Sequence, residues 1–564
     1  MPKAASPPPS TGEGREQSMG QDGNGPGKKR PAKENAASKA DHIPLVQAVV
    51  AELGHPEDLM TRQLRLDGQT VEIVFIDGLV DRTTIQDTIV NRLQREALRR
   101  RAQVSRRSGI TLQDAEASMV GTPHLERVEE LDQIINRLLE GGTLIAADNW
   151  KQALMASTEG WEKRDITEPD TESVVRGSRE GFTENLRTNT ALVRRRLRSR
   201  DLVLERLRVG SVSNTPVTIM YLKGIAHESL LAEVKQRLAR VDINGVLESG
   251  YLEEWIEDNP FSPFPQVQYT ERPDRVAAAL LQGKVAIMAD NTPMALIVPT
   301  TLNSLMHAPD DYSERSWLSL PVRLVRYTGL IFTLLLPATY VALTSYHVEL
   351  VPTPLMLSLI RQRETVPYPS VVEALGMELV LQILIEAGVR LPRPVGSAVT
   401  IVGAIVIGDA AVSAGLVSAT MVITASLTAL ASFTIPAYNL GATIRWLGVL
   451  LIIPASILGI LGLLFGIMAL LIHLANLRSF GVPYLVPTAP MVWESNREDM
   501  LWRSYHWRQP FRPQFLARRE TRSIGSSEAT GLQGWKPPQQ PPARESKHLE
   551  LERSYSATAR GRTR

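Results

Sequence analysis

The chain has 564 residues and 43% hydrophobic composition, a length that allows about three or four domains. Its formal net charge is only +2, which excludes the strongly basic surface of a nucleic-acid-binding protein, so no nucleic-acid partner is expected. It contains no cysteine, which excludes disulfides, thiolate metal sites and cysteine nucleophiles.

Residues 1–41 are rich in Pro, Gly, Ser and Lys and contain no apolar stretch of the kind found in a secretory signal. Such a composition cannot bury a hydrophobic core. We therefore expect a disordered N-terminal extension.

An internal repeat is the most informative feature of the part that follows. LLEGGTLIAADN from Leu138 matches LLQGKVAIMADN from Leu280. Upstream, VEIVFIDGLVDRTTIQDTIVNRL from Val71 resembles VTIMYLKGIAHESLLAEVKQRL from Val217. Each upstream copy predicts an alternating strand, a Gly turn and an amphipathic helix. The repeat therefore predicts two similar α/β lobes, at 42–160 and 212–310.

Each copy of the repeat ends in an Asp-Asn pair, Asp148-Asn149 in the first and Asp290-Asn291 in the second. Before the pair, Leu-Leu-x-Gly predicts a helix that ends with Gly as its cap, and an apolar strand follows. Asp and Asn commonly form turns, and we interpret both pairs as turn residues. The alternative is a ligand-binding role in a cleft between the lobes, because domain interfaces often hold small-molecule sites.

Residues 161–211 are predicted to form an Arg-rich helical connector between the lobes. Helical periodicity begins near Thr183, and the run contains Arg194, Arg195 and Arg196. Runs of like charge usually lie on a solvated helix face, which is the interpretation we favour. A surface that faces a partner protein or lipid headgroups is the alternative.

Long apolar segments predict a polytopic α-helical membrane domain at 311–490. A first span, 324–346, is interrupted by Pro337. Three later segments reach or approach the ~20 apolar residues that cross a bilayer core, namely 398–416, 421–437 and 446–474. The expected fold class is therefore a duplicated α/β domain followed by a polytopic helical membrane domain.

The distribution of arginine predicts the orientation of these spans. Arg315, Arg323 and Arg326 precede the first span, and an Arg-rich stretch from Arg497 follows the last. By the positive-inside rule, the α/β domain and the C-terminus should both be cytoplasmic. The number of crossings is then even, and both four and six remain open. Residues 491–564 are rich in Arg and Pro and predict a mostly disordered tail.

The segment 370–390 is apolar but is interrupted by Glu373, Glu378 and Glu386. Carboxylates are costly in lipid, so this helix should face protein, water or the membrane interface. Arg445, near the start of the last predicted span, is a further charge that we expect in the membrane interior.

The segment 398–416 is the candidate pore helix. Its small residues recur at three- and four-residue spacing, which permits close approach of identical helices. Val402, Ile405 and Val412 would then form an apolar constriction that can gate by dewetting. Stripes of small residues, including a Gly-x-x-x-Gly pattern in the last span, are more often packing seams than pores, and this alternative stays open.

Asp409 is an ionisable residue in the otherwise apolar candidate pore helix. Such a group suggests a pore, a cavity or a buried partner. Pairing with Arg445 is the alternative to a pore role, because intramembrane charges are commonly paired.

The chain shows no enzymatic constellation. Its 9 histidines are scattered, and no zinc-protease, serine-hydrolase, P-loop or dinucleotide-binding motif is present. We expect no catalytic residues, no cofactor and no metal site, and we do not expect an enzyme.

A set of short motifs follows one order along the chain. They are VVRGSREGFTE from Val174, IEDNPFSPFPQ from Ile256, TERPD at 270–274, SYH at 345–347, VPYPS at 366–370, EAGVRLP at 386–392 and IVGAIVIGDAAV from Ile401. In this combination they resemble the A subunit of GerA-type spore germination receptors, over about residues 165–490. Asp409 departs from the family pattern, in which a neutral amide is more usual.

The resemblance implies a multi-pass nutrient receptor of the spore inner membrane that triggers germination. The A subunit would contact membrane lipid and work with a permease-like B subunit and a lipoprotein C subunit. It would form a homo-oligomer, expected to be a pentamer, that acts as a nutrient-gated ion channel. Two other functions remain open, a non-conducting scaffold that signals to the B and C subunits and a secondary transporter. A transporter should show inverted membrane repeats, which the sequence does not show.

Overall fold

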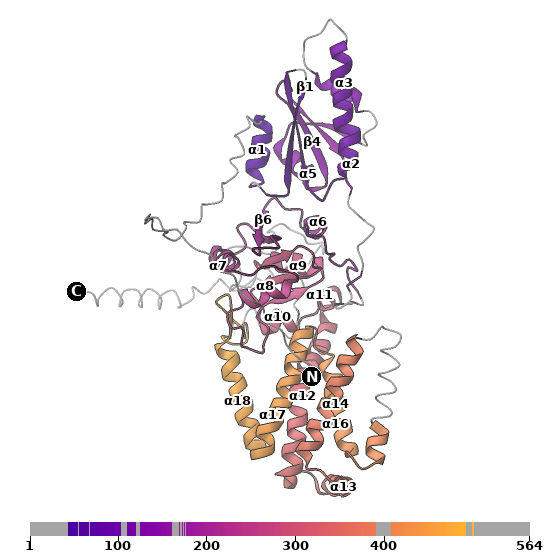
Figure 1. Ribbon diagram of the computed structural model, residues 1–564, viewed down its shortest axis with the longest axis vertical. Coiled ribbons are helices and arrows are strands. Elements are labelled where there is room, and N and C mark those ends of the chain that lie inside the picture. Colours follow the sequence, from indigo (N-terminus) through magenta and orange to yellow (C-terminus); the bar gives the residue numbers. More distant parts are fainter. Residues whose placement is uncertain are drawn as a thin grey trace, which may run out of the picture.

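The computed structural model shows three stacked parts, two α/β units and a bundle of apolar helices (Figure 1). The first unit lies farthest from the bundle, and the second unit lies between the two. The described residues are 43–54, 56–66, 68–102, 110–119, 124–160, 168–169, 172, 174, 176–390, 408–491, 499–500 and 503. The predicted extension 1–41 and nearly all of the predicted tail 491–564 lie outside them.

The first unit is built on a five-stranded antiparallel sheet with strand order β1-β2-β4-β5-β3. Its elements are α1 (Pro44–Glu52), β1 (Leu59–Leu66), β2 (Gln69–Ile76), α2 (Arg82–Thr84), η1 (Ile85–Val90), α3 (Asn91–Ala102), α4 (Leu112–Ser118), β3 (Leu125–Val128), α5 (Leu131–Leu139), β4 (Gly142–Ala147) and β5 (Ala153–Ser157).

Helices cover both faces of this sheet, because side chains alternate along each strand. Val71 and Ile73 of β2 pack with η1 and α3 in one hydrophobic core. Val74 and Ile76 pack with α1 and α5 in the other. A strand buried on both faces shows a nearly continuous apolar run, which is the pattern seen in the sequence.

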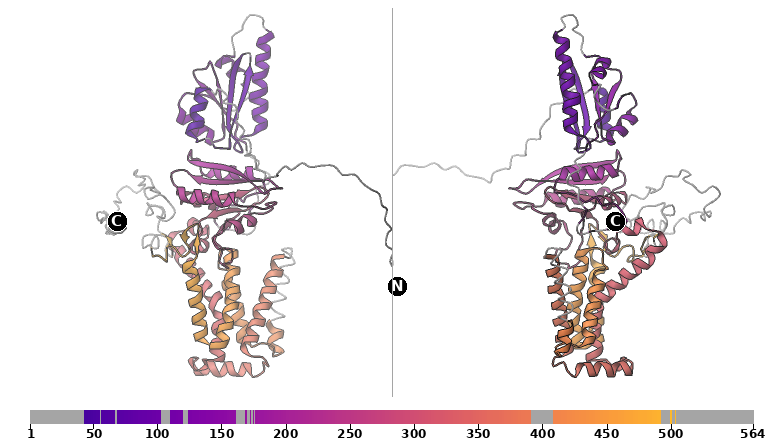
Figure 2. Two further views of the ribbon diagram at one scale, coloured as in Figure 1. Left: turned by 60° about the vertical axis from the view of Figure 1, so that its left-hand side comes forward. Right: turned by 90° about the vertical axis from the view of Figure 1, so that its right-hand side faces the viewer.

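The second unit repeats this architecture in a second five-stranded sheet, with strand order β6-β7-β9-β10-β8 (Figures 1 and 2). Its elements are α6 (Leu186–Arg196), β6 (Leu202–Val209), β7 (Thr215–Leu222), α7 (Glu228–Ala239), α8 (Ser249–Ile256), β8 (Gln268–Thr270), α9 (Pro273–Leu281), β9 (Val285–Ala289) and β10 (Ala295–Val298). Strand for strand, the order matches that of the first unit. The prediction of two similar α/β folds, rather than one continuous sheet, is therefore confirmed.

Helix α6 lies within the predicted Arg-rich connector and begins the second unit, as α1 begins the first. Its Leu192 and Val193 belong to the core of the second unit, whereas Ala191 packs into the core of the first. The prediction of a solvated face is wrong for Arg194, which is 1% exposed and pairs with Asp58 of the first unit. The sequence does not reveal this contact, because the partner lies 136 residues away.

Glycine ends the equivalent helix in both units, as the repeat predicts. Gly141 follows α5 with a φ of 102°, and Gly283 follows α9 with a φ of 90°. These left-handed conformations disfavour a side chain, so glycine is the natural cap before each central strand.

The third part is the helical bundle with its flanking segments. Its elements are α10 (Leu302–Met306), α11 (Asp310–Ser313), α12 (Ser316–Ser345), η2 (Val348–Leu350), α13 (Thr353–Arg363), α14 (Ser370–Arg390), α16 (Ala419–Ser432), α17 (Tyr438–Leu458), α18 (Ile460–Asn476), β11 (Arg478–Ser479) and β12 (Val482–Pro483). Helix α13 lies across the end of the bundle that is far from the α/β units (Figure 1).

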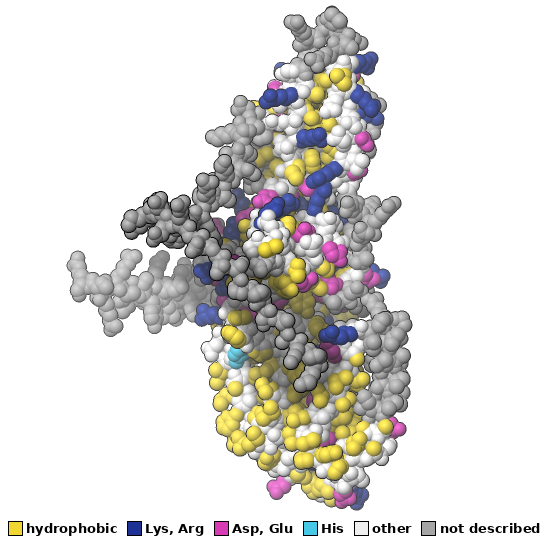
Figure 3. All heavy atoms as spheres, viewed as in Figure 1, with side chains coloured by type: hydrophobic (Ala, Val, Ile, Leu, Met, Phe, Trp, Pro, Cys, Tyr) yellow, Lys and Arg dark blue, Asp and Glu magenta, His cyan; other side chains and the backbone are white. Residues whose placement is uncertain are grey.

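Among the described residues, α12 and α17 are long and apolar enough to cross a membrane, and α16 and α18 are shorter apolar helices. Hydrophobic side chains spread over the bundle surface, while charged side chains gather over the α/β units (Figure 3). Such a large exposed apolar surface marks a membrane or protein contact. Helix α12 covers the predicted first span except its last residue, Tyr346, and continues through Pro337.

The prediction of a single last span at 446–474 is wrong. The chain reverses at Gly459, which has a φ of 62°, so α17 and α18 form a helical hairpin. Hydropathy does not reveal this break, because both helices are apolar up to the turn. The predicted span 398–416 is described only from Gly408 onward, and the rest of it lies outside the described residues.

The Gly-x-x-x-Gly pattern of the last span is a packing seam between α17 and α18. A Cβ atom on Gly462 would collide with the carbonyl oxygen of Pro454, and one on Gly466 would meet the side chain of Leu451. Small residues let the two helix backbones approach this closely.

Candidate functional site

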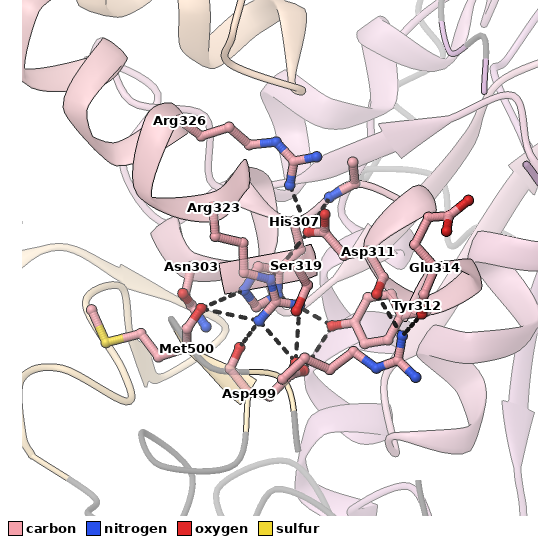
Figure 4. Close-up of polar contacts among 12 residues, drawn as sticks. Asn303, His307, Asp311, Tyr312, Glu314, Ser319, Arg323, Arg326, Asp499 and Met500 are labelled. Carbon is pink, nitrogen blue, oxygen red and sulfur yellow. Dashed lines mark hydrogen bonds and ion pairs between the residues drawn. The ribbon is translucent and has the colours of Figure 1, made fainter. Parts of the chain in front are cut away.

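A buried ionic network joins α11, in the segment that follows the second unit, to the start of α12 (Figure 4). Arg323 is 0% exposed, and its Nε donates to Asp311 Oδ2 at 3.2 Å. Arg326 Nη1 donates to the same oxygen at 2.6 Å. Two arginines three residues apart lie on one helix face, so both can reach the same carboxylate, that of Asp311 in α11. The network comprises Asp311, Tyr312, Arg323, Arg326, Asp499 and Arg503, and we call it the junction network.

Residues beyond the bundle close the junction network from the other side. Asp499 Oδ1 lies 3.1 Å from Arg323 Nη2, and the Tyr312 hydroxyl donates to Asp499 Oδ2 at 2.7 Å. Arg503 Nη1 donates to the carbonyl oxygens of Asp311 at 2.6 Å and Glu314 at 2.9 Å. The chain after α18 is thereby fixed to the segment that enters the bundle.

Burial sets the protonation of the neighbouring groups. The pKa of His307 is lowered to about 4, chiefly by burial, so the ring is neutral near pH 7. Burial raises the pKa of Tyr312 well above its usual value, and its hydroxyl stays a hydrogen-bond donor. The charges of the junction network are therefore those of its three arginines and two aspartates. Asp311 pairs with Arg323 and Arg326, and Asp499 pairs with Arg323.

The predicted membrane-interior carboxylate Glu373 lies inside the bundle, 2% exposed. Its Oε1 accepts from the backbone nitrogen of Ser418 at 2.6 Å and from the Ser418 hydroxyl at 2.5 Å. Tyr340 of α12 lies 3.0 Å from the same hydroxyl. Ser418 is the N-cap of α16, so one polar cluster connects α12, α14 and α16.

The other two glutamates of α14 have different surroundings. Glu378 is 3% exposed and interacts electrostatically with Arg445, which also donates to Ser432 Oγ at 3.4 Å. Glu386 is more than half exposed and pairs with Arg390 at 2.6 Å. Among the described residues, Arg445 therefore interacts electrostatically with Glu378.

The candidate pore residues are only partly described. Asp409 is exposed, and no ion pair joins it to Arg445 within the part of the chain that the structure describes. Val412 is half-buried in the same short helical stretch. Val402 and Ile405 lie outside the described residues, so the apolar constriction stays a prediction.

Both Asp-Asn pairs form turns, as the sequence predicts. Asp148 Oδ2 accepts from the Thr70 nitrogen, and Asp290 Oδ1 accepts from the Leu186 nitrogen, each at 3.1 Å. The second pair also borders a cavity of about 420 Å³ between the units. The lining includes Asp77, Arg187, Arg206, Asp290 and Asn291.

Sequence reasoning missed the junction network. The sequence analysis interprets three arginines, Arg315, Arg323 and Arg326, as charges beside a membrane span. In the structure Arg323 is buried, whereas Arg315 is exposed. The available signal is the pair of aspartates at 310 and 311, just before the arginines of α12. That spacing is compatible with an ion pair but does not specify one.

Fold and site together define a class of protein in which a duplicated α/β domain is followed by an apolar helical bundle whose first helix is held by buried charges. The family model of the Bacillus/Clostridium GerA spore germination protein matches residues 47–515. The chain belongs to this family.

Two spore germination proteins of Bacillus subtilis agree with this assignment. Spore germination protein KA of Bacillus subtilis (strain 168) is 42% identical, with 83% of this chain and 85% of the relative covered. Spore germination protein B1 of the same organism is 37% identical, with 84% and 95% covered. The crystal structure of the N-terminal domain of the A subunit of the Bacillus megaterium spore germinant receptor GerK3 is 31% identical, covers 45% of this chain and 92% of that one, and gives a TM-score of 0.36.

Proposed function

We propose that this chain is the A subunit of a germinant receptor in the spore inner membrane and that it forms a pentameric, nutrient-gated ion channel. It would work with a permease-like B subunit and a lipoprotein C subunit, with membrane lipid around the bundle. The support for the receptor role is the set of relatives named as spore germination proteins, matched over most of their length.

The exposure of the Asp409 carboxylate is the observation that supports the channel proposal most. Asp409 is exposed on the single chain, beside Gly408 and Ala410, and it has no ion-pair partner among the described residues. A carboxylate in an apolar region is costly unless it meets water or a partner. In a closed ring of copies, equivalent carboxylates can line one shared water-filled path.

The neighbouring helices offer surfaces for such a ring. The Asp409 stretch packs on α16, since a Cβ atom on Gly408 would lie 3.8 Å from Val422. Large apolar side chains remain exposed on both α14 and α16, namely Val372, Leu379, Ile383, Ile423, Leu427 and Leu430. These faces can contact lipid or a second copy.

A chain of polar contacts connects the second α/β unit with the helices of the bundle. Arg275 of α9 donates to the His307 carbonyl oxygen at 3.2 Å, and the junction network fixes the following helix, α11, to α12. The Glu373 cluster then connects α12 with α14 and α16. A rearrangement of the second unit on germinant binding, by this chain or by a partner subunit, would therefore move helices next to Asp409.

Asp409→Asn is expected to lower cation conductance and reduce cation selectivity, with assembly unchanged. Loss of one unit charge removes about 1 kcal/mol of attraction for an ion ~4 Å away in water, a roughly fivefold effect. The measurement is ion current through the purified A subunit in planar bilayers.

Glu349→Gln is the matched control, because Glu349 is an exposed carboxylate beyond the end of α12. Equal currents in the Asp409 variant and the wild type would contradict a pore role. A wild type without current would favour the scaffold alternative, and saturable flux of a single solute would favour a transporter.

The proposed topology places both α/β units on the cytoplasmic side. Because the chain lacks cysteine, single cysteines at Ser211, exposed on the second unit, and at Glu349 can be labelled without background. A membrane-impermeant maleimide should reach Glu349→Cys only from outside and Ser211→Cys only from inside. Labelling of both sites from the same side would contradict the proposed topology.

A further inference from the structure

A cavity of about 300 Å³ lies between the second unit and the segment that leads into the bundle. Helix α9 and strand β10 border it on one side, and α10 and α11 border it on the other. Its polar lining includes Arg275, Lys284, Ser304, His307 and Tyr312. Its volume is at the lower end of the ~300–1,000 Å³ typical of small-molecule sites.

Lys284 is the unusual member of this lining. It is 4% exposed, and its side chain has no hydrogen bond or ion pair within the part of the chain that the structure describes. A buried ammonium without a partner is costly, so its presence needs a reason. The internal repeat shows that the fold does not require it, because the matching position in the first unit is Gly142.

The other charged side chains around the cavity already have ion-pair partners. Arg275 pairs with Glu172 and donates to the His307 carbonyl oxygen at 3.2 Å. Asp274 Oδ2 lies 2.6 Å from Arg272 Nη2, and Asp499 belongs to the junction network. His307 is neutral, so the protonated form of Lys284 has no counter-charge among the described residues that line the cavity.

We propose that this cavity binds a small carboxylate anion, with the carboxylate on Lys284 Nζ and a short apolar part against Ala278, Ala279 and Ile297. A singly charged ligand fits a single uncompensated cation, whereas a phosphate dianion would leave a charge unpaired. The apolar side chains of the lining favour an organic anion over chloride. This inference rests on the geometry of the cavity and does not depend on the channel role.

Titration of Lys284 gives a second readout. Burial, with a smaller contribution from Arg275, lowers the pKa of this amino group to about 7. A bound carboxylate favours the charged form and raises that pKa. Binding near pH 7 should therefore take up a fraction of a proton, which calorimetry in buffers of different ionisation enthalpy measures directly.

The test uses the full chain in detergent, titrated with acetate, propionate or butyrate, with chloride and phosphate at equal ionic strength for comparison. The melting temperature of the wild type should rise with carboxylate concentration, because a ligand that binds only the folded state stabilises it. Lys284→Met keeps the length and fills the site without the charge, so it should fold and lose this response. Lys235→Met is the control, since Lys235 is a partly exposed lysine paired with Glu205 at 2.6 Å.

A response in the wild type and the Lys235 variant, with proton uptake, that is absent in Lys284→Met would support the site. An equal response in Lys284→Met, or a response to chloride or phosphate as large as that to the carboxylates, would overturn it. A wild type that neither gains stability nor takes up protons with any carboxylate would also overturn it, whether or not the Met variant folds.

Discussion

Arg323→Met is expected to destabilise the protein by about 3–5 kcal/mol, the usual cost of removing one partner from a buried ion pair. The substitution removes the guanidinium that bridges Asp311 and Asp499, which leaves the buried Asp311 with Arg326 as its remaining ion-pair partner. It also removes the hydrogen bond, 3.1 Å long, to the Met500 carbonyl oxygen, which helps to hold the chain after α18. Helix α11 and the chain after α18 should then separate from α12 more easily.

The measurement is thermal unfolding of the full chain in detergent, followed by near-ultraviolet circular dichroism. Arg315→Met is the matched control, because Arg315 precedes the same helix but is exposed. Arg323→Lys should fall between the two, since lysine keeps the charge but not the planar fork that reaches two carboxylates. If Arg323→Met melts at the same temperature as Arg315→Met, the junction network does not stabilise the fold.

Arg194→Met should loosen the contact between the two α/β units by a similar amount, about 3–5 kcal/mol. The guanidinium makes two hydrogen bonds of 3.0 Å to the Asp58 carboxylate and one of 3.2 Å to the Leu202 carbonyl oxygen. Asp58 is itself 3% exposed, so it would be left as an unpaired buried charge. The loss of stability should be greatest around α6, which packs between the two units.

Hydrogen exchange followed by mass spectrometry measures this loosening locally. Amide exchange should become faster in α1 and α6 and should change little in α17. Arg198→Met is the control, because Arg198 follows α6 but is exposed. Unchanged exchange in α1 would contradict the view that the Arg194–Asp58 pair joins the units.

Local patterns in the sequence determine much of the architecture. The matched segments from Leu138 and Leu280 predict two α/β folds, and the structure gives each a five-stranded sheet of the same order. The prediction succeeds because the alternation of apolar residues in strands, the periodicity of helices and the glycine caps are all set by residues close together in the sequence. The apolar composition after residue 311 predicts a helical bundle for the same reason, although the turn at Gly459 is hidden in a continuous apolar run.

Only the tertiary structure decides which charges are buried and paired. Arg194 and Arg195 are neighbours in one basic run, and the sequence predicts the same exposure for both. In the structure Arg194 is buried and pairs with Asp58. Arg323 meets Asp499 across 176 residues, and Lys284 occupies a position where the first unit has glycine. Burial and charge pairing depend on contacts between distant segments, whereas propensity and periodicity report only on near neighbours.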